Sequence, residues 1–484
     1  MSISGALSNA LSGLTATSRM AELVSSNISN AMTDGYGRRE LAVSSRLIGD
    51  YGGVAIDGVT RHMNSGIVAD RRFAQSDFSN ASKELDFLSR LETLVGTPED
   101  AFSLSARMAN FESDLVSAAS RPDVNERLEA VFRSANALSE TFNSISDSIQ
   151  GMRTEADHNI ATQVDQLNQA LQQVRDLNIR ISTSVNQGKD PSSLQDHRQV
   201  LIDQISEIVP VREVPRDRGT VALFTPGGAI LLDGPAATVE FETTNLIVPH
   251  MTVEGGHLSG LSINGHAIRT DSAMGPLSGG TLGALFEIRD ETANVAQAQI
   301  DAVARDVVER FQDSGIDPSL GAGMPGLFTD LGAAFASADE VGLAGRMTVN
   351  ALVNPDTGGD VWKIRDGIGA ITPGEVGDGA LLSAMVNVMG EARAPVSGGF
   401  GTAMRSAAEL GANFLSRIGS ARELVEQATT FASTQLSELK AQELEGGVDT
   451  DQEMQRLMLV EQAYAANARM MQAVDAMMQT LLEL

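Results

Sequence analysis

The chain has 484 residues, enough for roughly three domains, and its 42% hydrophobic content is that of a folded protein. Its formal net charge is −28 at pH 7 and no segment concentrates Lys and Arg, which argues against binding to nucleic acid or anionic lipid. The absence of cysteine excludes disulfides, Cys-ligated zinc, iron–sulfur clusters and thiol catalysis. Aromatic residues make up only 4%, which favours long helices packed through small and medium side chains.

The N-terminal segment, residues 1–36, is predicted to form a helix that ends in a turn. Its apolar and small residues alternate in steps of four and three, the spacing of a coiled-coil seam. An ordinary amphipathic helix on a globular core would show the same spacing. The positions are Ile3, Leu7, Ala10, Leu14, Thr17, Ala21, Val24, Ile28 and Ala31.

This segment does not have the pattern of a secretory signal peptide. Its first basic residue is Arg19, and Ser and Asn interrupt the stretch where an apolar region would lie. No apolar run in the chain reaches the roughly 18 residues of a membrane span. We therefore expect that any export of the protein uses a route without a cleaved signal.

The next part of the chain is predicted to be helical after a short β segment. Alternating and β-branched residues over 33–62 predict a hairpin or an extended arm. Helical periodicity covers 66–95 and 101–119, and Pro122 follows the second helix. A long helix is predicted over 128–181, with a phase slip near Ala156 that changes its winding without ending it. A further helix is expected to end near Val209.

The stretch 211–280 has a different texture, with short β-prone runs between Gly and Pro turns. We expect strands at 221–224, 230–232, 238–241, 246–253 and 258–263. Helical periodicity returns over 281–311, a Gly-rich mixed segment follows to about Gly377, and helices fill most of the chain to Glu445. The predicted fold is mainly α: a helical middle domain (37–210 and 281–445, including the hairpin arm) carries a small β-rich inserted outer domain (211–280).

The C-terminal segment, residues 446–484, repeats the seam spacing of the N-terminus. Its positions are Leu457, Val460, Tyr464, Asn467, Met471, Val474, Met478 and Leu481. Ordering a helix of about 30 residues costs about 1–2 kcal/mol per residue, whereas about nine seam positions return about 1–3 kcal/mol each. We therefore predict a terminal coiled-coil domain (1–36 and 446–484) whose helices are marginal alone and frayed in the free monomer.

Six methionines are concentrated in this last segment, at Met454, Met458, Met470, Met471, Met477 and Met478. Flexible thioether side chains suit either core filling or a surface that meets more than one partner. The sequence leaves both interpretations open.

No pattern in the sequence indicates catalysis, a cofactor or a metal site. Residues 321–326 match a dinucleotide fingerprint in letters, but a helix precedes them and Pro325 interrupts them, so a loop is predicted. None of the histidines forms a close helical pair; His250, His257 and His266 share the β-rich stretch. Neither a nucleophile elbow nor a phosphate-binding loop is present. The sequence predicts a protein that is not an enzyme.

The turn after the first helix reads Asn27-Ile-Ser-Asn30-Ala-Met-Thr33-Asp-Gly35-Tyr36-Gly-Arg38. It resembles the N-terminal signature of the flagellar axial proteins, the family of rod, hook and hook-associated subunits. The C-terminal residues Glu461-Gln462-Ala463-Tyr464, Ala466, Ala468-Arg469, Asp475 and Leu481-Leu482 resemble the family's other end. The signature positions to which the family gives weight are Asn27, Asn30, Thr33, Gly35 and Tyr36.

Internal blocks resemble the hook-associated branch that builds the first hook–filament junction. These are Asp196–Gln204, Gly279–Asp290, the helix pair around Pro122, and Gly447-Val448-Asp449 before the last helix. The chain departs from the branch at Asp34, Gly37 and Arg39, where Pro, Ser and Gln are usual. The stretch 211–280 has no counterpart that we recognise.

The resemblance implies an extracellular flagellar part at the hook–filament junction, exported unfolded through the flagellar type III apparatus from the cytoplasm. It implies self-association in a ring, with the terminal helices lining the inner tube. The implied partners are the hook protein, the second junction protein and an export chaperone on the C-terminal helix. The alternatives are a rod or hook subunit, or a surface-displayed enzyme or adhesin whose activity lies in 211–280.

Overall fold

The computed structural model describes residues 3–45, 52–270 and 275–482. The helices are α1 (Ile3–Ser29), α2 (Ser65–Val95), α3 (Leu104–Ser120), α4 (Asn125–Asn186), α5 (Ser192–Ile208), α6 (Gly280–Glu287), α7 (Ala293–Gln312), α8 (Trp362–Asp366), α9 (Ala380–Gly390), α10 (Ala407–Glu445) and α11 (Thr450–Leu482). The strands are β1 (Arg38–Ser45), β2 (Val54–His62), β3 (Arg212–Pro215), β4 (Val221–Phe224), β5 (Ile230–Leu232), β6 (Val239–Glu240), β7 (Leu261–Ile263), β8 (His266–Ile268), β9 (Phe328–Asp330) and β10 (Met347–Val349). The prediction of a mainly α fold is confirmed.

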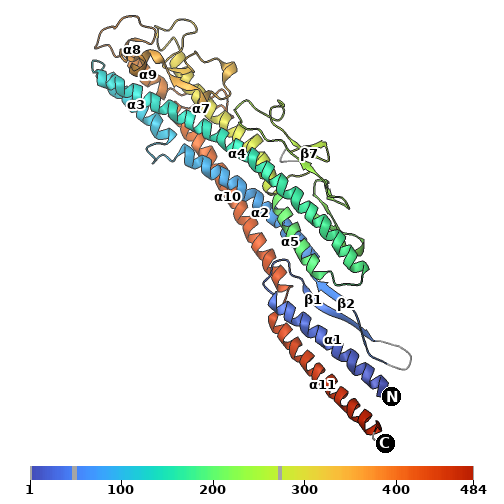
Figure 1. Cartoon of the computed structure of the whole chain (residues 1–484). Helices are drawn as coiled ribbons and strands as arrows, with labels where there is room; N and C mark the ends of the chain where they lie inside the picture. The colour runs from blue at the N-terminus through green and yellow to red at the C-terminus, as the bar shows by residue number, and fades with distance from the viewer. Residues whose placement is uncertain (1–2, 46–51, 271–274, 483–484) are drawn as a thin grey trace.

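The molecule is elongated and its long helices run along its length (Figure 1). Both chain ends lie at one tip, where α1 and α11 run side by side next to the β1–β2 hairpin. We call these elements the terminal unit. The remaining helices form the body, with α3, α8 and α9 at the opposite tip. The terminal unit is connected to the body through α2, α5 and the end of α10.

The hairpin predicted from the alternating residues of 33–62 is present. β1 and β2 pair antiparallel from Arg38 opposite His62 to Ser45 opposite Val54, with a bulge after Ala42. The hairpin contacts α1 along its length. Its bulge sits beside Gly58, whose φ of 153° is accessible to glycine at no steric cost.

The body is built around α4, which continues unbroken for 62 residues. Its buried side chains follow steps of three and four, so one stripe faces α3, α5, α6 and α7. The predicted phase slip falls inside this helix, where Ala156 and Ile160 are both buried. Arg153 and Asp157 take buried positions at the slip. The interruption of the apolar pattern therefore marks a place where charged side chains enter the core.

Those two residues belong to a buried ion network. The Arg289 guanidinium donates to Asp157 Oδ1 at 2.7 Å and to Asp290 Oδ1 at 2.8 Å. Arg153 donates to the carbonyls of Arg289 at 2.9 Å and Met251 at 2.8 Å. Arg289 lies on a π-helical turn, Ile288–Thr292, between α6 and α7. The helix predicted over 281–311 therefore exists, but with a wider turn that directs Arg289 into the core.

The far end of the body has an aromatic core. The ring of Phe111 on α3 lies 5.6 Å from that of Phe311 and 5.5 Å from that of Phe328, and the last two lie 5.3 Å apart. All three side chains are buried. Gly326 approaches so closely that a Cβ there would lie 1.9 Å from the Phe311 carbonyl oxygen. The glycine-rich residues 321–326 form a loop, as predicted, and this close packing explains one of the glycines.

The stretch 211–280 forms two three-stranded antiparallel sheets, β3–β4–β5 and β6–β7–β8. Asn178 and Asn168 of α4 each bond both the N–H and the C=O of one strand residue, Val221 and Val239 respectively. Each Asn side chain thus pairs with a strand as a neighbouring strand would. The buried apolar residues of both sheets belong to the same core as those of α4.

The prediction of a strand at 246–253 is wrong, because this segment is irregular. Its polar backbone groups bond to α4 side chains instead of a neighbouring strand. Ile247 N–H donates to Thr154 Oγ1 at 3.3 Å, and the Met251 carbonyl accepts from Arg153. Pro249 also lacks a ladder donor. Strands β3, β8, β9 and β10 were not predicted; each has only three or four residues, too few for a periodic signal.

Candidate functional site

The two terminal helices pack antiparallel, and small side chains let them approach. Gly13 of α1 lies level with Asn467 of α11, close enough that a Cβ on Gly13 would lie 2.8 Å from the Asn467 amide. Asn27, two residues before the end of α1, lies level with Glu453 at the start of α11. The buried residues of α1 are Gly5, Ala10, Gly13, Ala16, Thr17, Val24 and Asn27. The pair therefore buries little apolar area for its length.

The predicted seam residues are in three different environments. Buried are Val24, Val460 and Val474. Half-buried are Ile3, Leu14, Ile28, Leu457 and Met471. Exposed are Leu7, Tyr464 and Met478. The side chain of Leu481 lies outside the described residues. The chain thus covers one edge of the predicted seam and leaves the other edge open.

The outer surface of α11 is rich in exposed apolar side chains. Met454, Met458, Leu459, Met470 and Met477 are each about half exposed or more. Within this chain these methionines do not fill a core, so core filling does not explain them. An apolar surface of this length is typical of helices that pack against another subunit.

The signature turn joins α1, the hairpin and α11 through one buried amide. Asn27 is fully buried, and its Oδ1 accepts from Tyr36 Oη at 2.9 Å and from Arg39 N–H at 3.0 Å. Its Nδ2 donates to the Arg39 carbonyl at 2.9 Å and to Glu453 Oε2 at 3.0 Å. All four hydrogen-bonding positions of the amide are used, so no other side chain could replace Asn27 here without losing a bond.

The other signature residues shape the turn. Asn30 bonds the Ser26 carbonyl at 2.9 Å and accepts from Thr33 Oγ1 at 3.4 Å. Gly35 has φ of 75°, and a Cβ there would lie 2.7 Å from Val200 Cγ2 on α5. A side chain at this position would therefore be strained twice, by its backbone conformation and by contact with the body.

Asp196 on α5 holds the hairpin against the body. Its carboxylate accepts from Gly37 N–H at 3.1 Å, Arg39 Nη2 at 2.5 Å and Arg61 Nε at 2.6 Å. Arg61 also donates to the Gly35 carbonyl at 2.9 Å. Gly37 and Arg39 are two of the departures from the family pattern. A Cβ on Gly37 would lie 2.5 Å from Arg61 Nε, so only glycine at this position leaves room for the Arg61 side chain.

A second set of ion pairs ties α2 to α5 and α10. Arg71 pairs with Asp203 at 2.7 Å and with Glu443, and Arg72 pairs with Asp203 at 2.6 Å and Glu213 at 2.6 Å. Both arginines are buried. Burial opposes the charge of Arg72, yet the two carboxylates raise its pKa above the usual value. This site was missed from the sequence, although the Arg71-Arg72 pair inside an otherwise amphipathic helix could have drawn attention to it.

The terminal unit and the body thus meet at a polar joint. A cavity of about 410 Å³ lies there, lined by the signature turn, α2, α5 and the end of α10. Arg456 of α11 pairs with Glu40 of β1, which adds a bond between the C-terminal helix and the hairpin. Buried charged bonds fix geometry more than they add stability. The joint is therefore built to hold the terminal unit in one orientation.

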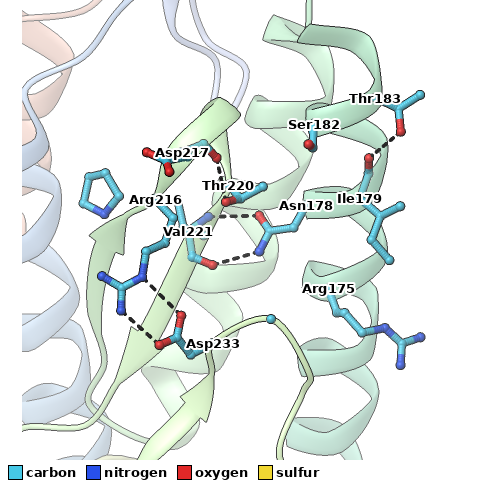
Figure 2. Close-up of a pocket in the computed structure, with 12 residues that line it drawn as sticks. Arg175, Asn178, Ile179, Ser182, Thr183, Arg216, Asp217, Thr220, Val221 and Asp233 are labelled. Atoms are coloured by element: carbon cyan, nitrogen blue, oxygen red, sulfur yellow. Dashed lines mark hydrogen bonds and ion pairs between the residues drawn. The ribbon is translucent and has the colours of Figure 1, made fainter. Parts of the chain in front are cut away.

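A surface hollow of about 930 Å³ lies between α4 and the β3–β5 sheet (Figure 2). Its polar groups bond to one another. Asn178 bonds Val221 twice, and Arg216 pairs with Asp233 at 3.0 Å (Figure 2). The ion pair is at the surface, where the guanidinium lowers the pKa of Asp233. This hollow holds a strand against a helix and presents no arrangement of nucleophile and base.

No group of three or more His, Asp or Glu side chains suited to a metal ion occurs within the described ranges. The rings of His250 and His257 lie 5.7 Å apart in an edge-to-face arrangement, and His266 does not join them in that contact. In the part of the chain that the structure covers, no helix is long and apolar enough to cross a bilayer.

Two family models match the chain. The helical domain of flagellar hook-associated protein FlgK matches residues 88–319, and the C-terminal model of flagellar basal body rod FlgEFG proteins matches residues 445–484. The first covers the body from α2 into the Gly-rich segment, including both small sheets. The second covers α11, whose exposed apolar face is described above.

The similar curated proteins are all named flagellar hook-associated protein 1. Flagellar hook-associated protein 1 of Escherichia coli (strain K12) is 25% identical over 332 residues, 66% of this chain and 59% of the relative. Those of Salmonella typhimurium (28% over 243 residues; 49% and 44%) and Bacillus subtilis (24% over 293 residues; 55% and 57%) are also similar. The chain thus spans about half the length of these relatives.

A solved structure, the flagellar hook junction protein FlgK from Burkholderia pseudomallei, is similar with a TM-score of 0.43 and 21% identity, over 55% of this chain and 46% of that one. Over the body, one family model and the curated relatives point to hook-associated protein 1, and at the C-terminal helix the matching model is that of the FlgEFG rod proteins. The chain is therefore similar to flagellar axial proteins at both the body and the C-terminal helix, and over the body it is similar to hook-associated protein 1.

Proposed function

We propose that this chain is a structural subunit of the bacterial flagellum that forms the first junction ring between hook and filament, and that it is not an enzyme. The observation that supports this most is the terminal unit. The two ends of the chain form one antiparallel helix pair, locked to the body by the signature turn, and several apolar side chains of α11 remain exposed. A subunit that assembles through its ends needs apolar side chains that can contact neighbouring subunits.

The seam residues would then have two roles. Val24, Val460 and Val474 hold α1 against α11 within the subunit. Leu7, Tyr464 and Met478, which are exposed in the single chain, would contact neighbouring subunits in the ring. The half-buried positions Ile3, Leu14, Ile28, Leu457 and Met471 are intermediate in exposure between these two sets, and the role of Leu481 in the seam stays a prediction from its spacing.

The proposal includes a location and a set of partners. The subunit would act outside the cell, after export through the flagellar type III apparatus from the cytoplasm, and would contact the hook protein and the second junction protein. An export chaperone would hold α11 before assembly, because the same exposed apolar side chains need cover in the cytoplasm. No cofactor is required for any of these roles.

A gene deletion tests the proposal. Electron microscopy of the deletion strain, with an assay for flagellin in the medium, should show hooks without filaments and shed flagellin monomers. If the deletion strain lacks hooks, the chain is a rod or hook subunit. Normal filaments would contradict a junction role and favour a surface-displayed accessory protein with activity in 211–280.

Complementation of the deletion strain tests the role proposed for the seam. The wild-type gene should restore filaments, while a gene encoding Val474→Asp should not. Full-length Val474→Asp protein in the medium would show that export is intact and that assembly is the step lost. Filaments assembled with Val474→Asp would contradict the role proposed for the seam.

A further inference from the structure

One buried arginine at the joint, Arg198, lies next to a group of paired arginines and carboxylates. We define the joint cluster as five arginines and four carboxylates: Arg39, Arg61, Arg71, Arg72, Arg198, Asp196, Asp203, Glu213 and Glu443. Four of the arginines make ion pairs with these carboxylates. Arg198 makes none with any residue that the structure describes.

Arg198 is buried, with 7% of its surface exposed. Its Nη1 donates to Asn178 Oδ1 at 2.8 Å and to the Gly219 carbonyl at 2.7 Å, both neutral acceptors. Burial lowers the pKa of Arg198 to about 10, Glu213 partly opposes this, and repulsion from Arg61 and Arg72 adds to it. The group is still charged at neutral pH. A buried charge that makes no ion pair is costly, so an anion beside Arg198 would be stabilised.

A cavity of about 300 Å³ gives an anion room at this place. Arg61, Arg72 and Arg198 line it, together with Ser65 and Gly66 at the start of α2, and the single carboxylate on its wall is Glu213. The first turn of the 31-residue helix α2 adds a partial positive charge. Guanidinium groups bind carboxylate, sulfate and phosphate through paired hydrogen bonds.

We propose that this cavity binds one small oxyanion, a carboxylate or a phosphate-type group, which pairs with Arg198 and holds the terminal unit against the body. Two sources share this chemistry. One is a free inorganic anion, and the other is an acidic side chain of a second copy of the chain. The proposal concerns the isolated chain and does not depend on the junction role.

The first experiment measures the thermal midpoint of the full chain while sulfate or phosphate replaces chloride at constant ionic strength. An anion that binds only the folded state raises the midpoint in a saturable way. Arg198→Gln should abolish this rise. Arg216→Gln is the matched control, because Arg216 pairs with Asp233 at the surface outside the cavity; it should respond as the wild type does. A saturable rise that persists in Arg198→Gln would overturn the proposal.

A second variant covers the case in which Arg198→Gln does not fold. Ala69 lines the same cavity from α2 and is half-buried. Ala69→Glu supplies a carboxylate from the chain itself, so it should raise the midpoint in chloride and remove the response to sulfate. Ala69→Gln has nearly the same size without the charge and should do neither. An Ala69→Glu chain that still responds to sulfate as the wild type does would contradict the proposed site.

The two sources are separated by sedimentation of the same variants. Saturable binding of sulfate or phosphate by the isolated chain assigns the cavity to a free anion. No response to either, with self-association of the wild type that both Arg198→Gln and Ala69→Glu lose, assigns it to an acidic side chain of a second copy. No anion response together with unchanged self-association in both variants would overturn the proposal.

Discussion

The body and the terminal unit are both made of long helices, yet they bury very different side chains. The body encloses large residues completely, among them Phe111, Phe142 and Phe328. The α1–α11 pair buries mostly Gly, Ala, Thr and Val, and its Met, Leu and Tyr side chains are half-buried or exposed. Because the hydrophobic contribution scales with the apolar area removed from water, at about 25 cal/mol per Å², the body can be stable alone and the pair is marginal. A similar spacing of apolar residues therefore occurs both in the core of the body and in a helix pair that we expect to need neighbouring subunits.

The largest effect on stability is expected in the aromatic core of the body. Phe111→Ala removes a fully buried ring that contacts two others, and we expect a loss of about 3–5 kcal/mol in the free energy of unfolding. Urea titration followed by far-UV circular dichroism measures it. Phe431→Ala on α10 is the matched control, because Phe431 is 72% exposed. Equal losses of unfolding free energy in the two variants would contradict the inference that the buried aromatic core stabilises the body.

A second effect in the body depends on pH. Asp301 on α7 is buried, and burial raises the pKa of its carboxyl to about 6 despite N–H donors at Ala344 and Gly342. Its folded pKa exceeds the ordinary value of 3.8, so its contribution to stability is fully present below about pH 4. That contribution is lost as pH rises through 6, by about 3 kcal/mol in all.

Asp301→Asn cannot lose a proton, so its stability should fall less than that of the wild type between pH 4 and 7. Urea titrations of both proteins at unit steps of pH give the difference. All other carboxyl groups are shared by the two proteins and cancel in this comparison. A difference that stays constant with pH would contradict the raised pKa.

In the terminal unit we expect a smaller effect on the body and a large one on assembly. Val474→Asp places a charge at a position that is 2% exposed, and the several kcal/mol this costs exceed what a marginal helix pair supplies. The unfolding midpoint of the body should not change, while helicity falls. Leu14→Asp should act in the same way.

Met478→Asp is the matched variant on the open side of α11, where the side chain is 45% exposed. It should leave the helix pair of the monomer intact and weaken only self-association, measured by sedimentation. A Met478→Asp chain that associates as the wild type does would remove that residue from the proposed contact surface.

The last prediction requires no mutation. Amide hydrogen exchange of the unmodified monomer should be fast at Leu14 and Met471, because local opening of a helix pair that buries little apolar area requires little free energy. Leu138 on α4, which is fully buried, should exchange only through global unfolding. Slow exchange at Leu14 or Met471 would mean that the pair is stable without neighbours, and the contrast with the body would no longer hold.

Much of the helical architecture was predictable because it is local. The spacing of apolar residues located α2, α3, α4 and α5 to within a few residues, and even the phase slip at Ala156 had a structural meaning. The strand predicted at 246–253 failed because α4 side chains, about a hundred residues earlier in the chain, satisfy its backbone. No local pattern carries that information.

The joint shows the same limit at the candidate site. The signature turn was recognisable from Asn27 to Tyr36, but not its partners. Asp196 lies 159 residues from Gly37, and Glu453 lies 426 residues from Asn27. Charged residues are frequent throughout the chain, so their types alone cannot indicate which of them meet.

By itself, the sequence determined where most of the long helices form, that the two ends share one seam spacing, and which family the chain resembles. These properties depend on residue spacing within a few turns and on contiguous motifs. Only the tertiary structure decided which edge of each seam is covered, which carboxylates hold the joint, and that Arg198 makes no ion pair within the described part of the chain. Those outcomes depend on side chains brought together from distant parts of the chain, where burial and charge act through space and not along the sequence.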